Sequence, residues 1–192
     1  YMFFYGLDQL VSNPLSLFFI WEGGLSFHGG LIGVIVSLYA YSYQHRVSFL
    51  RLADSICAAM PIGLGLVRIG NFLNGELYGR PTDGTWGFIF PTDPYGFTRH
   101  PSQLYEAFFE GLFLFVLLML ISSKNSKHGV ISGSFLLAYG LIRFFIEYFR
   151  QPDSHMGYVA LQLSMGQLLS IPMVIIGLIL LTKSLRKNEA IS

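Results

Sequence analysis

Five apolar stretches constrain the fold of this chain more than any other feature. Each is close to the roughly 20 residues that an α-helix needs to cross a bilayer. They cover approximately residues 25–43, 49–70, 104–122, 129–149 and 161–182. Because lipid cannot satisfy free backbone groups, we expect all five to be helical. The sequence therefore predicts an all-α polytopic membrane protein with five transmembrane helices, forming one transmembrane domain over residues 1–192.

Composition supports a membrane protein and excludes several other classes. Hydrophobic residues make up 53% of the chain and charged residues only 12%, against about 25% charged in soluble domains. The net charge of +1 gives no basic field for nucleic acid. The single cysteine, Cys57, excludes an internal disulfide framework. The chain opens on Tyr1 without a signal-peptide pattern, and we expect it to lack an N-terminal part of a longer protein.

The distribution of basic residues predicts an orientation. If residues 44–48 lie inside, then 123–128 and the tail after 182 are also inside. These inner segments hold all four lysines and three arginines: Lys124, Lys127, Lys183, Lys187, Arg46, Arg51 and Arg186. The outward or intramembrane bases are all arginine, whose planar fork suits bidentate contact with phosphate. The split could also arise by chance from so few residues.

Residues 71–103 form a long extracytoplasmic loop in this orientation. Loops of this length are usually functional or disordered. Its aromatic residues argue against disorder and favour a loop that rests on the membrane interface; they are Trp86, Phe88, Phe90, Tyr95 and Phe97.

A polar cluster lies between the second and third apolar spans, over residues 68–106. Ionisable groups beside hydrocarbon are costly and usually mark a site. The cluster contains Arg68, Asn71, Asn74, Glu76, Arg80, Arg99, His100, Gln103 and Glu106. Arg68 could instead reach lipid head groups by snorkelling, and ordinary helix capping accounts for Ser102 as an N-cap. Snorkelling and capping explain the asparagines, His100 and Glu106 less well.

Two other spans contribute candidate residues. His28 is near the outer end of the first span, where it is either a hydrogen-bonded structural histidine or a general acid or base. In the fourth span Tyr139, Arg143 and Glu147 share one helical face. Arg143 lies roughly 9 Å inside the outer end of its span. It could form a structural ion pair with Glu147, or it could face a polar cavity and bind phosphate.

Several chemistries have no motif here. The zinc, serine-hydrolase, Walker and dinucleotide patterns are missing, and acidic residues are not clustered at metal-ligand spacing. We therefore expect no metal and no cofactor. Arginine, histidine, asparagine and glutamate suit a transfer from a lipid with a phosphate leaving group, because arginines stabilise the departing charge. A transporter or lipid-binding protein could use the same arginines, but inverted repeats and paired broken helices, which would favour that alternative, are not found in the sequence.

The motifs resemble those of the bacterial prolipoprotein diacylglyceryl transferase family. RIGNFLNGELYGR is similar to the family signature G-R-x-G-N-F-x-N-G-E-x-x-G-R, with Val67-Arg68 at its opening G-R. FHGGLIG, RHPSQLYEA, YGLIRFFIEYFRQPD and LSMGQLLSIPM also match, so the resemblance covers nearly the whole chain. Family members commonly have seven spans, which implies that N-terminal helices are absent from this chain.

The resemblance implies both a reaction and the residues that serve it. A diacylglyceryl group would move from phosphatidylglycerol to the lipobox cysteine thiol of a prolipoprotein, forming a thioether and releasing glycerol 1-phosphate. The enzyme would act as a monomer in the bacterial inner membrane, with its site toward the outer face. Arg68 matches the family's lipid-binding arginine. His28, Asn71, Gly79 and Arg143 match residues the family is thought to need, and Tyr139, Glu76 and Glu147 lie in matching motifs.

Overall fold

The computed structural model describes residues 27–124, 127–151, 158–160 and 163–186, which form parts of two compact units, Tyr1–Phe49 and Leu50–Ser192. In the first unit the described helix is α3, Phe27–His45. It ends at a turn in which Arg46 adopts a φ of 52°. The Val47 nitrogen donates to the Ser42 carbonyl at 3.2 Å, which satisfies one of the carbonyls left free at this end, and the Ser42 hydroxyl donates to the Val47 carbonyl at 2.6 Å.

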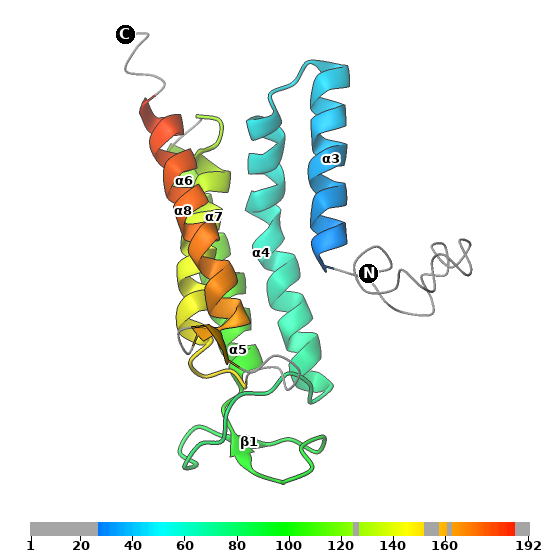
Figure 1. Ribbon diagram of the computed structural model, residues 1–192, viewed down its shortest axis with the longest axis vertical. Helices are drawn as coiled ribbons and strands as arrows, with labels where there is room; N and C mark the ends of the chain where they lie inside the picture. The colour runs from blue at the N-terminus through cyan, green and yellow to red at the C-terminus, as the bar shows by residue number, and fades with distance from the viewer. Residues whose placement is uncertain (1–26, 125–126, 152–157, 161–162, 187–192) are drawn as a thin grey trace, which may run out of the picture. The chain divides into compact units, whose positions relative to one another are not determined.

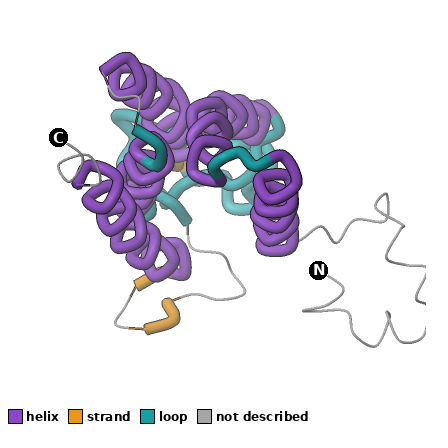
Figure 2. The backbone as a smooth tube through the Cα atoms, turned by 90° about the horizontal axis from the view of Figure 1, so that it is seen from above, coloured by secondary structure: helices purple, strands orange, loops and turns teal. Residues whose placement is uncertain are grey.

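The described residues of the second unit form four helical segments (Figure 1). They are α4 (Phe49–Leu73), the continuous run of α5 (Ser102–Glu106), η3 (Ala107–Phe113) and α6 (Leu114–Lys124), then α7 (Val130–Ile146) and α8 (Met165–Arg186). The buried core of the unit is formed where α6 and α7 face each other, by Leu114, Leu118, Ile131 and Phe135. Figure 2 shows that strand is confined to short segments.

Three of the described helices are long and apolar enough to cross a membrane: Phe49–Leu73, Ser102–Lys124 and Met165–Arg186. Val130–Ile146 is also apolar but shorter. These findings confirm a helical membrane protein. The predicted count of five spans stays a prediction, as does the single transmembrane domain.

Helices α7 and α8 pack with their backbones close together. A Cβ at Gly133 would lie 2.9 Å from the Leu181 nitrogen, and one at Gly177 would lie 2.5 Å from the Leu137 nitrogen. Only glycine fits so near a neighbouring backbone, and small residues are the usual means of close helix packing in membranes. This contact fixes α7, and therefore Arg143, against α8.

The carboxylate of Asp54 caps the first turn of α7 from another helix, α4. It accepts hydrogen bonds from the Gly129 and Ser132 nitrogens at 2.6 and 2.8 Å, and from the Ser132 hydroxyl at 2.7 Å. Gly129, the residue before α7, has a φ of 90° and no side chain to serve as a cap. Asp54 thus satisfies the free N–H groups of this helix start.

Helix α8 begins four residues later than the apolar pattern predicts. Leu163–Ser164 pairs as β4 with β3, Tyr158–Ala160, and the helix starts at Met165. Ser164 and Gln167 cap one another: the Ser164 nitrogen donates to Gln167 Oε1 at 3.1 Å, and the Gln167 nitrogen donates to Ser164 Oγ at 3.3 Å. This reciprocal capping box sets the boundary, so the predicted helical start at 161 is wrong.

The loop between α4 and α5 has a small folded core of its own. Strands β1 (Phe88–Ile89) and β2 (Thr98–Arg99) pair antiparallel. The Phe72 ring meets the rings of Phe88 and Phe90 edge-on at 5.4 and 5.9 Å. Phe90 is buried, so the loop is ordered around aromatic residues as its composition suggested.

Candidate functional site

The carboxylate of Glu106, at the end of α5, is the centre of a cluster of arginines. Its Oε2 lies 2.5 Å from Arg68 Nε on α4. Its Oε1 lies 3.2 Å from Arg143 Nη1 on α7 and 3.8 Å from Arg150 Nη1, just beyond α7. Glu106 is 1% exposed. One buried carboxylate therefore joins cations from three parts of the sequence, including the two arginines that sequence reasoning singled out.

Two neighbours on α5 hold Glu106 in place by bonding to the end of the signature segment. Gln103 Nε2 donates to the Glu76 carbonyl at 2.6 Å. Ser102 Oγ donates to the Leu77 carbonyl at 3.3 Å. Ser102 is the first residue of the helix, and no side chain caps this end. The prediction that Ser102 is an N-cap is therefore wrong, because its hydroxyl is used for a tertiary contact.

Arg143 is held by three carboxylates. Glu147, one turn along α7, lies 3.0 Å from Nη2, which confirms the ion pair that the spacing in the sequence allowed. Room for the Glu147 carboxylate comes from Gly166 in the first turn of α8, where a Cβ would lie 2.7 Å from Oε2. Tyr139 stacks on Phe135 at 5.5 Å in the same helix. The ion pair with Glu147 limits where Arg143 can point.

Glu110 is the third carboxylate near Arg143, and sequence reasoning did not single it out. Its Oε1 lies 3.7 Å from Arg143 Nη1, and the side chain is fully buried. It belongs to η3, a wider π-helical turn that interrupts the span; such turns occur frequently at functional sites. An acidic residue in the middle of an apolar run is costly by itself, and that cost was the signal that could have identified it.

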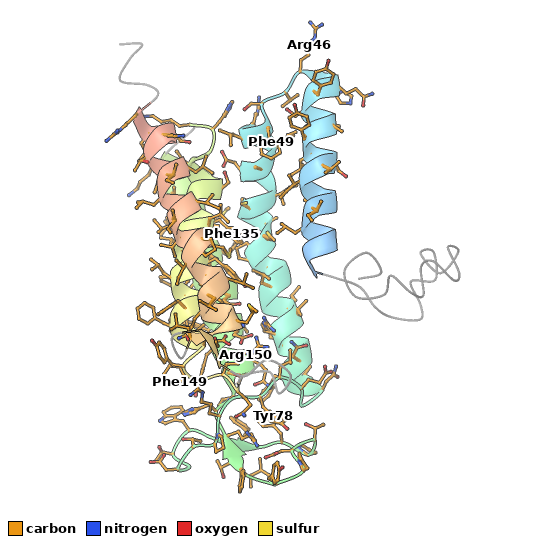
Figure 3. The ribbon with its side chains drawn as sticks, viewed as in Figure 1. Arg46, Phe49, Tyr78, Phe135, Phe149 and Arg150 are labelled. Atoms are coloured by element: carbon orange, nitrogen blue, oxygen red, sulfur yellow. The ribbon has the colours of Figure 1, made fainter. Side chains whose placement is uncertain are left out.

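The end of the signature segment is joined to the end of α7 by backbone contacts. The Gly79 nitrogen donates to the His100 carbonyl, and the Arg80 nitrogen to the Phe149 carbonyl, both at 2.9 Å. A Cβ at Gly79 would lie 2.5 Å from the Phe149 oxygen, so only glycine fits there. Figure 3 shows Phe149 and Arg150 at the loop end of the helices, on the side of Tyr78.

The remaining predicted residues differ in their surroundings. The Asn71 carbonyl accepts from the Glu76 nitrogen at 2.8 Å, and the Asn74 nitrogen donates to Gly70. The side chains of Asn74 and Glu76 are exposed. His100 Nδ1 lies 3.3 Å from the Tyr105 hydroxyl. His28 falls in the first turn of α3, but its side chain lies outside the described residues.

A separate ion pair stabilises the loop below the arginine cluster. Arg99 Nε and Nη2 donate to the two oxygens of Asp93 at 2.7 and 3.0 Å. The Arg99 guanidinium also lies 4.7 Å above the Tyr78 ring. The hydrogen bond from Arg99 lowers the pKa of Asp93 below its ordinary value, and the same bond raises the pKa of Arg99.

An apolar hollow of about 200 Å³ lies between α4 and η3, beside the ion pair of Arg68 and Glu106. Its lining includes Ile69 and Ala107, the sequence neighbours of those two residues. The helices meet at Gly65 and Gly111, where a Cβ on Gly111 would lie 2.8 Å from the Gly65 Cα. A hydrocarbon surface therefore adjoins buried arginines, which is the combination that an anionic lipid requires.

These features define a helical membrane protein with a charge-compensated arginine site beside an apolar surface. A family model described as prolipoprotein diacylglyceryl transferase matches residues 1–183 of the chain. Similar proteins are described as phosphatidylglycerol–prolipoprotein diacylglyceryl transferases. One from Idiomarina loihiensis is 48% identical over 184 residues, which cover 96% of this chain and 69% of the relative.

Two further relatives with the same description agree. The Geobacter sulfurreducens protein is 52% identical over 178 residues, covering 93% of this chain and 68% of its own length. The Aeromonas hydrophila protein is 51% identical over 192 residues, covering 98% and 69%. The chain spans about two thirds of the length of these relatives. It belongs to the prolipoprotein diacylglyceryl transferase family.

Proposed function

We propose that this chain transfers the diacylglyceryl group of phosphatidylglycerol to the lipobox cysteine of a prolipoprotein, the first step of lipoprotein maturation. The cysteine sulfur forms a bond to the glyceryl carbon, and the bond from that carbon to the phosphate oxygen breaks. The products are a thioether and glycerol 1-phosphate. The observation that carries this proposal is the meeting of Arg68 and Arg143, from two helices, at one buried carboxylate.

Arg68 and Arg143 hold the lipid phosphate in this proposal and stabilise the charge that develops as it leaves. Both are largely buried, so their charges act through a poorly screening medium. Glu147 orients Arg143 through its 3.0 Å contact. Asn71, Asn74, Glu76, Gly79, His100 and Tyr139 complete the proposed substrate-binding set. The hollow beside Arg68 suits a lipid that enters sideways from the bilayer.

The thiol must lose a proton to become an effective nucleophile, because its ordinary pKa of about 8.5 keeps it mostly protonated at neutral pH. His28 is our favoured base. A second possibility is that the nearby arginines make the thiolate sufficiently available without a base. The proton leaves with the products in either case.

The proposed setting is the bacterial inner membrane, with the site toward the outer face and the loop of residues 71–103 shaping the peptide side. All four lysines lie in segments assigned to the cytoplasmic side, which supports this orientation. The proposed working form is a monomer, and the partners are phosphatidylglycerol and the prolipoprotein signal peptide.

Transfer from phosphatidylglycerol vesicles to a synthetic lipobox peptide tests the function directly. We expect Arg143→Ala to lower the rate at least about a hundredfold, in the range typical of losing one donor to a developing anion. Arg186→Ala is the matched control, since Arg186 is exposed at the opposite end of the unit, and it should leave the rate unchanged. Normal rate and lipid affinity in Arg143→Ala would refute the phosphate role.

His28→Gln separates the two accounts of the thiol. A rate close to wild type shows that His28 is not the base and leaves the arginine account. Lipid binding without any peptide transfer in the unmodified chain would instead indicate a lipid-binding protein and overturn the proposed activity.

A further inference from the structure

Glu110 has no task in the reaction described above, although its burial is complete. Neither of its oxygens has a hydrogen-bond partner among the described residues. Its nearest cation, Arg143 Nη1, is 3.7 Å away. A buried carboxylate without hydrogen bonds is strongly disfavoured in its charged form unless neighbouring cations compensate it.

The charges around Glu110 are balanced in number. Among the described residues, Arg143 contacts Glu110 itself, and Arg68 and Arg150 contact Glu106, one turn earlier on the same segment. Two other acids belong to this cluster: Glu106, and Glu147 at the end of α7. Helix α7 also contributes the Tyr139 hydroxyl. With all three carboxylates ionised, the three arginines are neutralised. Counted over the described residues, such a cluster has no surplus positive charge for a phosphodiester.

The three carboxylates differ in how firmly the arginines hold them. Glu106 contacts all three arginines, the closest at 2.5 Å, and Glu147 contacts Arg143 at 3.0 Å. Glu110 has the longest contact with Arg143 and no hydrogen bond. Glu110 is therefore the acid whose negative charge is most easily lost when another anion arrives.

We propose that Glu110 takes up a proton when the cluster binds a lipid phosphodiester, and that this carboxyl thereby sets the single negative charge the site accepts. Protonation leaves three arginines against two carboxylates, a surplus of one positive charge that a phosphodiester balances. This inference rests on the proposed function for the identity of the lipid, phosphatidylglycerol. Glu110 acts here as a positioning residue through Arg143.

Titration calorimetry with a short-chain phosphatidylglycerol tests the proposal, in two buffers that differ in ionisation enthalpy. The purified wild-type protein should take up about one proton for each lipid bound. Glu110→Gln should bind the lipid with no proton uptake, because the amide is neutral in both states. Asp83→Asn is the control: Asp83 is an exposed carboxylate of the loop outside the arginine cluster, and this variant should keep the uptake of the wild type.

If Glu110→Gln does not fold, the pH dependence of lipid binding by the wild type provides a second test. Proton uptake favours binding at low pH, so the wild-type KM for lipid should rise with pH, by up to about tenfold per unit once the empty protein has Glu110 ionised. Glu110→Asp keeps a titratable group and should keep this dependence. Binding by the wild type without uptake, or unchanged uptake in Glu110→Gln, would overturn the proposal.

The two proposals can fail separately. Transfer to the lipobox peptide without proton uptake on lipid binding refutes the role of Glu110 and leaves the activity in place. Proton-coupled lipid binding without transfer refutes the activity and leaves the role of Glu110 in place.

Discussion

Replacing Glu106 by glutamine is the sharpest test of how the arginine cluster is held together. The substitution keeps the shape of the side chain and removes the charge that Arg68, Arg143 and Arg150 share. At the observed distances of 2.5, 3.2 and 3.8 Å, each attraction is about 4 to 7 kcal/mol with an effective dielectric constant of 20. Desolvation and repulsion among the arginines offset much of this sum.

The net change in the free energy of unfolding comes mainly from buried arginines that lose their charged partner. Removing one member of a buried ion pair costs about 3 to 5 kcal/mol. For a chain of this size, each kcal/mol lowers the melting temperature by about 2 to 4 °C. We therefore expect Glu106→Gln to unfold about 6 to 20 °C below the wild type in detergent, measured by circular dichroism.

Glu76→Gln is the control, because Glu76 has an exposed side chain and exposed substitutions usually change stability by less than about 0.5 kcal/mol. Added phosphatidylglycerol should raise the melting temperature more in Glu106→Gln than in the wild type, because a phosphate can replace the missing carboxylate. Equal melting temperatures for the two glutamine variants would refute the central role of Glu106.

Three further substitutions test other parts of the structure. Asp54→Ala should destabilise the unit by about 0.5 to 2 kcal/mol, as the loss of a helix cap does, and denaturant unfolding measures this. Gly79→Ala should greatly reduce transfer and folded yield because its Cβ would lie 2.5 Å from a carbonyl oxygen, whereas Gly63→Ala meets nothing within 4 Å and should preserve both. Because the pKa of Asp93 is lowered in the folded protein, its bond to Arg99 stabilises the loop above about pH 4. This stability is lost as the pH falls through the pKa of Asp93 in the folded protein. Protease cleavage within the loop should therefore increase at low pH in the wild type and already occur at neutral pH in Asp93→Asn.

The helices could be predicted within a few residues because the length of an apolar run is a property of the sequence alone. The predicted span 49–70 corresponds to Phe49–Leu73, and 129–149 to Val130–Ile146. The start of α8 was missed because Leu163 is apolar and was counted into the span, although it pairs as a strand and the capping box of Ser164 and Gln167 starts the helix after it. The capping box is visible in the sequence, but the pairing of Leu163–Ser164 with Tyr158–Ala160 depends on the tertiary fold.

The site was only partly predictable, for a different physical reason. The pair of Arg143 and Glu147 follows from helical spacing, which is local. The convergence on Glu106 depends on how α4, α5 and α7 pack, and no local spacing encodes that arrangement. Glu110 could have been noticed as an acid within an apolar span, but the way it faces could not be predicted, because a π-helical turn changes which side chains face inward.

The arginines of this site are already paired, which constrains how a lipid can bind. Glu106 uses Oε2 for Arg68 and Oε1 for Arg143 and Arg150, so a phosphate between these cations must replace part of a carboxylate contact. Such an exchange removes little additional water, because the arginines are desolvated before the ligand arrives. Affinity then depends on the difference between phosphate and carboxylate contacts rather than on the full charge of the cluster. We therefore expect weak binding of small anions such as chloride, which offer no bidentate contact to the guanidinium groups, and discrimination in favour of a phosphodiester whose acyl chains can occupy the adjoining apolar surface.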